Sequence, residues 1–316
     1  MGSAASTPTT PSAKVSAIFV YPIKSCRGIS VSHAPLAPYG FRWDRQWMVV
    51  NSQGRAYTQR IEPKFALVEV ELPPEAFLED WEPTQDSYMV VKAPGMQPLK
   101  ISLSTQQKEV ADGVSVWEWT GSAWDEGAEA SQWFSDYLGN PARLVRFNTA
   151  SEARPVDPDY VKGQHETLFT DGYQFHLASQ ESLDALNEVL KEPIPINRFR
   201  PNILVEGCEP YAEDLWTEIK IRKFSFFCAK LCYRCKIPAI DQETAIPGPE
   251  PNETLMKTRS GKIIRPNDRN KNRIYFGQYV VWNWKELSAE GSGKIIEVGD
   301  PVYVIRKVSS SAEAAA

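Results

Sequence analysis

Three of the five cysteines in this chain lie within eight residues, at Cys228, Cys232 and Cys235. Few thiols gathered in this way indicate sulfur chemistry rather than cross-linking. Three interpretations compete. The C-x3-C-x2-C spacing matches the iron–sulfur signature of radical S-adenosylmethionine enzymes, C-x2-C is half of a zinc site, and a single thiolate could hold the metal of a larger cofactor.

The surrounding sequence weakens the first two interpretations without removing them. Residues 236–316 read as strands and loops, whereas a radical enzyme needs most of its αβ barrel after the cluster. A structural zinc site needs four ligands. The remaining cysteines, Cys26 and Cys208, stand alone in the sequence, as do the three histidines.

The three clustered cysteines differ in their neighbours. Cys228 follows a phenylalanine-rich stretch that predicts a strand and a core position. Cys235 lies between Arg234 and Lys236. Two adjacent cations favour a thiolate, which is the form that a soft metal ligand requires. The sequence therefore favours Cys235 for metal chemistry.

Composition narrows the class of protein. The chain has 316 residues, of which 42% are hydrophobic and 24% charged, as in a soluble globular protein of one large domain or two. Its net charge of −5 argues against a general nucleic-acid binder. The odd cysteine count and the absence of a signal or transmembrane pattern in the first thirteen residues favour an intracellular compartment. Residues 1–6 match the N-myristoylation pattern at Gly2, or represent an expression remnant.

Hydrophobic periodicity predicts a mainly β protein with two clear helices. Apolar stripes at helical spacing cover residues 130–138, closed by Gly139, and residues 183–190, with Ser179 as N-cap. Strands are expected at residues 15–21, 46–51, 65–72, 114–120, 202–206, 218–222, 274–282 and 301–308.

A polar, proline-rich stretch at residues 151–163 divides the chain. The predicted fold class is α+β and predominantly β. We expect an N-terminal β-barrel domain over residues 14–150 and a C-terminal β-barrel domain over residues 151–310, with a few helices packed outside. Residues 1–13 and 311–316 are expected to be disordered tails.

Several separated motifs occur in an order that resembles the MOSC proteins. They are Tyr21–Gly28 (YPIKSCRG), Asn197–Asn202 (NRFRPN), Cys232–Cys235 (CYRC), Phe276–Tyr279 (FGQY) and Gly299–Val302 (GDPV). The resemblance covers residues 14–308. Among MOSC proteins the chain looks most like the amidoxime-reducing components, especially their plant-type members. The expected domains are therefore a MOSC N-terminal β-barrel domain and a MOSC domain.

This resemblance implies a molybdenum cofactor, in which the metal is held by the dithiolene of molybdopterin and by one cysteine. The matching cysteine is Cys235, which is thus the expected metal ligand and catalytic centre. The positions that match cofactor contacts are Lys24, Ser25, Arg45, Arg200, Asn202, Tyr233, Arg234 and Tyr279. Lys24, Ser25 and Arg45 match contacts to the pterin phosphate, a group that arginine grips bidentately.

The chain departs from the family pattern at two places. Some relatives carry hydroxyl residues after an aspartate where this chain has Gly172 and Tyr173, and many carry serine where it has Tyr233. We expect the first change to remove a cofactor hydrogen bond and the second to narrow the substrate range.

The reaction implied by the resemblance is reduction of the N–O bond of N-hydroxylated compounds, namely amidoximes and hydroxylamines, with nitrite as a further candidate. Asp171, Tyr173 and Asp241 are candidate proton donors by location. The chain shows no haem or flavin motif, so electrons must come from a partner. The family resemblance implies cytochrome b5 and its NADH-dependent reductase.

A basic segment is the expected docking surface for acidic cytochrome b5. Residues 257–273 contain seven cations and one acid, Asp268. Two other functions stay open, namely a non-enzymatic carrier of the molybdenum cofactor and a sulfur carrier with a persulfide on Cys235. The expected location is cytoplasmic or at the mitochondrial surface, with membrane association undecided.

Overall fold

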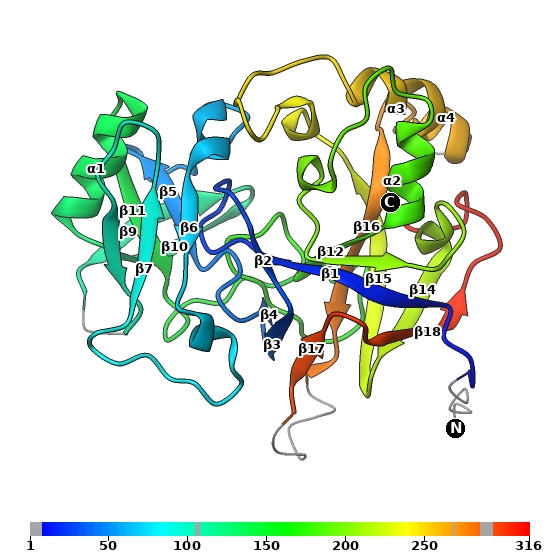
Figure 1. The fold of residues 1–316 in the computed structure, drawn as a ribbon, viewed down its shortest axis with the longest axis horizontal. Helices are drawn as coiled ribbons and strands as arrows, with labels where there is room; N and C mark the ends of the chain where they lie inside the picture. Colours follow the sequence, from blue (N-terminus) through cyan, green and yellow to red (C-terminus); the bar gives the residue numbers. More distant parts are fainter. Residues whose placement is uncertain (1–7, 105–107, 268, 285–292) are drawn as a thin grey trace.

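The computed structural model describes residues 8–104, 108–267, 269–284 and 293–316. The myristoylation pattern at Gly2 lies outside these residues. Two groups of strands lie side by side (Figure 1): a set of smaller sheets on the left, from the N-terminal half of the chain, and a barrel on the right. The molecule is predominantly β, as the sequence predicts.

Among the described residues, the largest sheet has eight strands in the order β13-β12-β16-β15-β14-β18-β1-β2. Pairing of β1 with β13 closes seven of them into a barrel. The barrel strands are β1 (Ala13–Val20), β12 (Phe175–Ser179), β13 (Ile203–Glu206), β14 (Trp216–Ile221), β15 (Phe224–Tyr233), β16 (Tyr275–Trp282) and β18 (Pro301–Lys307). The first strand of the chain is therefore built into the barrel of the C-terminal half. The domain limits at residues 14–150 and 151–310 stay a prediction.

Three smaller sheets complete the β structure of the described residues. One contains β5 (Trp47–Asn51), β11 (Ala142–Phe147), β10 (Trp119–Asp125) and β9 (Val110–Val116). The second contains β6 (Glu69–Glu71), β7 (Tyr88–Lys92) and β8 (Leu99–Ser102), and the third contains β17 (Ile295–Glu297), β3 (His33–Ala37) and β4 (Gly40–Phe41). The edge strand β2 (Ile29–Val31) follows β1 in the barrel sheet.

The described helices are short and cover the outside of the sheets (Figure 1). They are α1 (Ala128–Leu138), α2 (Gln180–Asn187), α3 (Asn252–Thr258) and α4 (Gly261–Ile264), with 3-10 turns η1 (Pro63–Leu67), η2 (Pro74–Phe77), η3 (Ile196–Arg198), η4 (Ala212–Leu215) and η5 (Ile237–Ala239). None of the described helices is long and apolar enough to cross a membrane.

Both helices predicted from the sequence are present, and the residues expected to end the first and to cap the second do so. Gly139 ends α1 in the left-handed conformation at φ 73°. The Ser179 side chain accepts a hydrogen bond from the Ser182 amide and so caps α2. However, α2 ends at Asn187, so Val189, which the periodicity placed on the buried face, is exposed.

Two predicted strands are wrong. Residues 65–72 form η1 and the short strand β6, because Pro63 starts a 3-10 turn in which Phe65 and Ala66 are both buried. Residues 114–120 form the end of β9, a turn and the start of β10. The turn contains Trp117 at φ 54°, without the glycine or asparagine that marks most such hairpins. Because polar and apolar residues alternate through the turn as well, the sequence pattern predicted one continuous strand.

The packing joins the two halves. One hydrophobic cluster contains Trp47 and Phe134 from the left group of strands together with Phe175 and Trp282 from the barrel. At the C-terminus, residues 311–316 were expected to form a disordered tail. In the structure Ala314 is buried, and the Leu231 amide donates to the Ala315 carbonyl at 2.8 Å.

Candidate functional site

A cavity of about 590 Å³ lies where the two halves meet. Twelve residues are singled out from the sequence for catalysis or cofactor binding, and eleven of them line this cavity: Lys24, Ser25, Arg45, Asp171, Tyr173, Arg200, Asn202, Tyr233, Arg234, Cys235 and Tyr279. Asp241, the third candidate proton donor, does not line it and pairs with Arg198 at 3.2 Å. Residues far apart in sequence are thus brought to one place.

The cavity is strongly basic. Its lining carries seven cations, namely Lys24, Arg45, Arg60, Arg154, Arg200, Lys230 and Arg234. It carries three carboxylates, namely Glu118, Asp157 and Asp171. The whole chain has a net charge of −5, so this excess is local. A concave site with such an excess attracts an anionic ligand.

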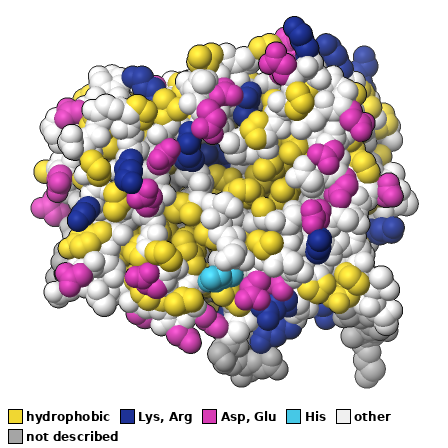
Figure 2. Space-filling view, in the orientation of Figure 1, with side chains coloured by type: hydrophobic (Ala, Val, Ile, Leu, Met, Phe, Trp, Pro, Cys, Tyr) yellow, Lys and Arg dark blue, Asp and Glu magenta, His cyan; other side chains and the backbone are white. Residues whose placement is uncertain are grey.

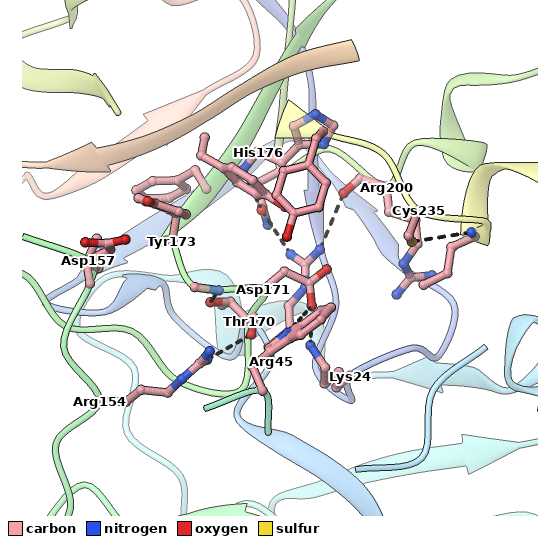
Figure 3. A pocket seen from close by; sticks show the side chains of 18 of the residues that line it. Lys24, Arg45, Arg154, Asp157, Thr170, Asp171, Tyr173, His176, Arg200 and Cys235 are labelled. Carbon is pink, nitrogen blue, oxygen red and sulfur yellow. Dashed lines mark hydrogen bonds and ion pairs between the residues drawn. The ribbon is translucent and has the colours of Figure 1, made fainter. Parts of the chain in front are cut away.

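Lys24 and Asp171 form an ion pair in the cavity wall (Figure 3), with Lys24 Nζ 2.6 Å from Asp171 Oδ1. Trp117 Nε1 also donates to Asp171 Oδ1 at 3.1 Å. Burial alone would raise the pKa of Asp171, but the charge and hydrogen bond of Lys24 hold it well below its usual range. Burial lowers the pKa of Lys24 to about 8, against the opposing charge of Asp171. Asp171 is therefore ionised at neutral pH.

Arg45 and Asn202, which line the cavity, belong to a hydrogen-bonded group with buried Asp44. Arg45 Nη1 donates to both carboxylate oxygens of buried Asp44 at 2.8 Å and to Asn202 Oδ1 at 2.9 Å. Asn202 Nδ2 donates to Asp44 Oδ1 at 3.0 Å and to the Phe19 carbonyl at 3.1 Å. Asn202 thus uses its side chain to hold β1 and Arg45 in place.

Tyr21 was not predicted as part of the site, although it begins the first motif. Its ring lies between the guanidinium groups of Arg45, at 4.1 Å, and Arg200, at 4.4 Å. Burial raises the pKa of Tyr21 to about 12, so the phenol stays neutral. The Tyr21 ring also packs on Gly28, where a Cβ atom would overlap it. The stacked ring fixes the separation of two cations that would otherwise repel.

The three clustered cysteines have different surroundings. Cys228 is half-buried in β15, and Cys232 is buried and accepts a hydrogen bond from Arg234 Nη1 at 2.8 Å. Cys235 lines the cavity, and its Sγ accepts from the Ile237 amide at 3.5 Å. Arg234 therefore contacts Cys232 rather than Cys235. No three His, Cys, Asp or Glu side chains gather as a metal site within the described residues, which argues against a three-cysteine ligand set.

Aromatic residues also contribute to the cavity lining. Tyr173 and Tyr279 stack with ring centroids 4.8 Å apart, and Lys230 Nζ lies 5.2 Å from the Tyr173 ring. The Tyr173 hydroxyl is buried and has no hydrogen-bond partner within the described part of the chain. Burial raises the pKa of Tyr173 beyond its usual value. Tyr233 is 38% exposed, and the Arg273 guanidinium lies 4.5 Å from its ring.

His176 is a further lining residue that sequence reasoning missed, because an isolated histidine gives no signal. It is buried, and its Nε2 lies 3.2 Å from the Phe276 carbonyl. Burial and the charge of Arg234 lower the pKa of His176 well below its usual value, so the ring is neutral. Gly277 permits this contact, since a Cβ atom there would overlap His176 and the Leu177 carbonyl.

The expected linker at residues 151–163 forms part of the wall, since Arg154 to Pro158 line the cavity. Arg154 Nη1 donates to the carbonyls of Leu168, at 2.6 Å, and Thr170, at 2.8 Å. A polar, proline-rich composition indicated a loop, but nothing in it indicated which surface the loop covers.

Backbone strain gathers at the same site. Four non-glycine lining residues have positive φ: Ser25, Arg45, Trp117 and Arg200. Gly172 has φ 108°, a conformation that side chains rarely adopt, although a Cβ atom there would have open space. The departure from the family pattern at this position therefore suits the backbone of this chain. Strain of this kind is characteristic of ligand sites.

Comparison with known families agrees with this architecture. The family model of the MOSC N-terminal beta barrel domain matches residues 12–141, and that of the MOSC domain matches residues 164–303. The fold is thus that of a two-domain MOSC protein.

Curated relatives refine the class. Mitochondrial amidoxime reducing component 2 of Rattus norvegicus is 32% identical, over 92% of this chain and 82% of its own length. Mitochondrial amidoxime-reducing component 1 of Homo sapiens is 30% identical over the same shares. The chain belongs to the amidoxime-reducing component family. Molybdenum cofactor sulfurase of Bos taurus is 29% identical, over 92% of this chain but 32% of its own length. The plant-type assignment stays a prediction.

Proposed function

We propose that this protein is a molybdenum-cofactor-dependent reductase of N-hydroxylated compounds. Its substrates would be amidoximes and hydroxylamines, with nitrite as a further candidate. Two relatives are named for amidoxime reduction. The observation that carries the proposal is the position of Cys235, the cysteine that lines the basic cavity.

The residues present fit an anionic pterin cofactor. Cys235 offers a thiol for a metal, and the seven lining cations offer charge for a phosphate. Two buried donor atoms without partners among the described residues, Tyr173 Oη and Arg234 Nε, are available for further hydrogen bonds. When bound, the cofactor would supply the two-electron redox chemistry.

The protein's own groups divide the remaining work. Asp171, ionised and paired with Lys24, is suited to hold that ammonium group in the cavity wall. Tyr173, whose raised pKa keeps it protonated, is suited to donate a hydrogen bond or a proton to substrate in the cavity. Tyr233, on the exposed rim, would limit the size of the substrate.

For the electron donor we propose cytochrome b5 with its NADH-dependent reductase. The exposed cations Lys257, Lys262, Arg269 and Lys271 lie on or beside α3 and α4. Figure 2 shows basic side chains along the upper right edge of the molecule, where Figure 1 draws these helices. An acidic donor would be steered to such a surface. We propose an intracellular location; the amidoxime-reducing relatives compared are named mitochondrial.

Two predicted docking cations have other roles. Arg259 is buried and pairs with Asp214, and Arg265 donates to the carbonyls of Ser311 and Ala314. The one acid of the segment, Asp268, lies outside the described residues. The guanidinium group of Arg273 contacts the Tyr233 ring, so the basic segment reaches a residue that lines the cavity.

A second candidate is a cofactor or sulfur carrier without reductase activity. The similarity to a molybdenum cofactor sulfurase supports it. In that role Cys235 would carry a persulfide, and the cations would bind the pterin without turnover.

The test is elemental analysis combined with turnover, using protein from a host that makes the cofactor. We expect about one molybdenum per chain in the wild type and in Cys208→Ala, a control thiol outside the cavity, and loss of molybdenum in Cys235→Ala. Benzamidoxime reduction with NADH, cytochrome b5 and its reductase should follow the metal content. Zinc or iron in place of molybdenum would overturn the cofactor assignment, and molybdenum without turnover would favour the carrier.

A further inference from the structure

A second cavity, of about 440 Å³, lies beside the first and shares four lining residues with it: Lys24, Thr58, Arg60 and Trp117. Its other lining residues come from the segment 55–61 and from the β9–β10 hairpin, namely Arg55, Ala56, Ile61, Ser115, Val116 and Thr120. Trp117, at the tip of the hairpin, is part of the wall between the two cavities. The function proposed above gives a role to Lys24 and Arg60, which line both cavities, but to no residue that lines only the second.

The lining of this cavity carries three cations and no carboxylate. Lys24 pairs with Asp171, which faces the first cavity. Within the described residues, no ion pair is formed by Arg55 or Arg60. The Arg60 guanidinium lies 4.3 Å from the Trp117 ring centroid, and its Nε lies 3.5 Å from Thr58 Oγ1. An aromatic face and a hydroxyl orient this cation, and the charge of Asp171 acts on it from beyond ion-pair distance.

The polar groups around these cations suit a group with several acceptor oxygens. Hydroxyls of Thr58, Ser115 and Thr120 line the same space as the two guanidinium groups. Thr58 is buried, so its position is fixed by packing. A phosphoryl group can accept from guanidinium forks and from hydroxyls at once, and such charge-assisted hydrogen bonds are among the strongest available.

We propose that the second cavity binds a phosphoryl group, as a phosphate monoester or as free phosphate. Trp117, which is 45% exposed, would contact the organic part of an ester. The site shares four lining residues with the thiol-bearing cavity, but Cys235, Arg45 and Arg200 do not line it. The inference does not depend on the proposed reductase activity, since it concerns binding.

The test is calorimetric titration of the cofactor-loaded protein with phenyl phosphate and with inorganic phosphate. Arg55→Gln and Arg60→Gln should each weaken phenyl phosphate binding about tenfold, as expected for loss of one charged hydrogen-bonding group. Lys191→Gln, an exposed cation outside both cavities, should leave it unchanged. Tighter binding of phenyl phosphate than of inorganic phosphate would identify the ligand as an ester, and equal binding as free phosphate.

Equal affinities in the wild type and both arginine variants would overturn the proposal. Binding to cofactor-free protein that disappears in the loaded protein would also overturn it, because the cavity would then belong to the phosphate of the cofactor. Measuring both forms of the protein therefore separates this site from the one proposed for molybdopterin.

Discussion

The ammonium group of Lys24 lies 2.6 Å from the Asp171 carboxylate, although 147 residues separate the two in sequence. The contact ties the turn after β1 to the segment before β12. Lys24 is almost fully buried, whereas 46% of the Asp171 side chain is accessible from the cavity. The depressed pKa of Asp171 contributes stability above about pH 4, where the unfolded carboxyl ionises, and this contribution is lost as the pH falls further.

The first prediction concerns the titration of Lys24. Its pKa of about 8 results from burial, opposed by the charge and hydrogen bond of Asp171. Asp171→Asn removes that opposition, so the Lys24 midpoint should move below 8. The measurement is an NMR titration of protein with labelled lysine Cε, in which Lys24 should titrate well below the exposed lysines. An unchanged midpoint in Asp171→Asn would show that the pair is not coupled.

The second prediction concerns the Tyr21 ring between Arg45 and Arg200. Tyr21→Phe keeps the ring and should leave stability and molybdenum content near those of the wild type. Tyr21→Leu removes both cation–π contacts and should cost about 2–4 kcal/mol of unfolding free energy, with loss of molybdenum. Urea denaturation and metal analysis measure the two effects. Equal behaviour of the two variants would show that the aromatic ring has no special role.

The third prediction concerns Gly277 in β16. Its φ is 72°, and a Cβ atom would overlap His176 and the Leu177 carbonyl. Gly277→Ala should therefore destabilise the protein by about 3 kcal/mol or more, from backbone strain and overpacking together. Gly95 is a matched control, with φ 79° and open space around it. Gly95→Ala should cost about 1 kcal/mol, and equal losses in urea denaturation would exclude the packing argument.

Eleven of the twelve residues singled out from the sequence line one cavity, whereas two of the predicted strands are wrong. The motifs around Lys24, Arg200 and Cys235 could be recognised because their spacing within each segment is local. Participation of Tyr21 and Trp117 could not be predicted, since it depends on contacts between segments far apart in sequence. From sequence alone, an aromatic residue in a strand or turn is predicted to pack in the hydrophobic core, because its neighbours in space are unknown.

The errors in secondary structure have a common cause. Residues 65–72 and 114–120 both show apolar periodicity, and period alone does not reveal where the chain turns. At Trp117 the turn adopts a left-handed conformation without glycine. The hydrogen bond from its indole to Asp171 and the stacking of Arg60 hold it there. Tertiary contacts therefore decide the local conformation, and these contacts also build the site.

The fourth prediction concerns the buried Tyr173 hydroxyl, which has no partner within the described residues. Because no protein hydrogen bond is lost, Tyr173→Phe should leave the free energy of unfolding unchanged or slightly higher. If the hydroxyl donates a proton to substrate, kcat should fall about a hundredfold.

Tyr160→Phe is the matched control, because the Tyr160 hydroxyl donates to the Ala316 carbonyl and lies outside the cavity lining. It should leave kcat near that of the wild type. Single-turnover reduction of benzamidoxime by the reduced enzyme measures the effect without the electron donor. A wild-type rate in Tyr173→Phe would remove this residue from the proposed chemistry.

The fifth prediction concerns the basic surface on α4 and the segment after it. Lys262 and Lys271 are exposed, whereas Arg259 and Arg265 of the same segment are engaged within the protein. Reversing both exposed charges, as Lys262→Glu with Lys271→Glu, should slow electron transfer from cytochrome b5 about tenfold at low salt and flatten its salt dependence. Electrostatic attraction raises the association rate of the two proteins, and salt weakens this attraction. With less attraction in the variant, both the rate at low salt and its decrease with added salt should be smaller.

The control reverses two exposed lysines of the N-terminal half, as Lys64→Glu with Lys100→Glu. It changes the net charge equally, so a general charge effect would slow both proteins alike. Stopped-flow oxidation of reduced cytochrome b5 measures the rate over a range of salt concentrations. If the two variants behave alike, the donor docks elsewhere. A selective effect of the α4 variant would place docking beside Arg273 and Tyr233, at the rim of the cavity that holds Cys235.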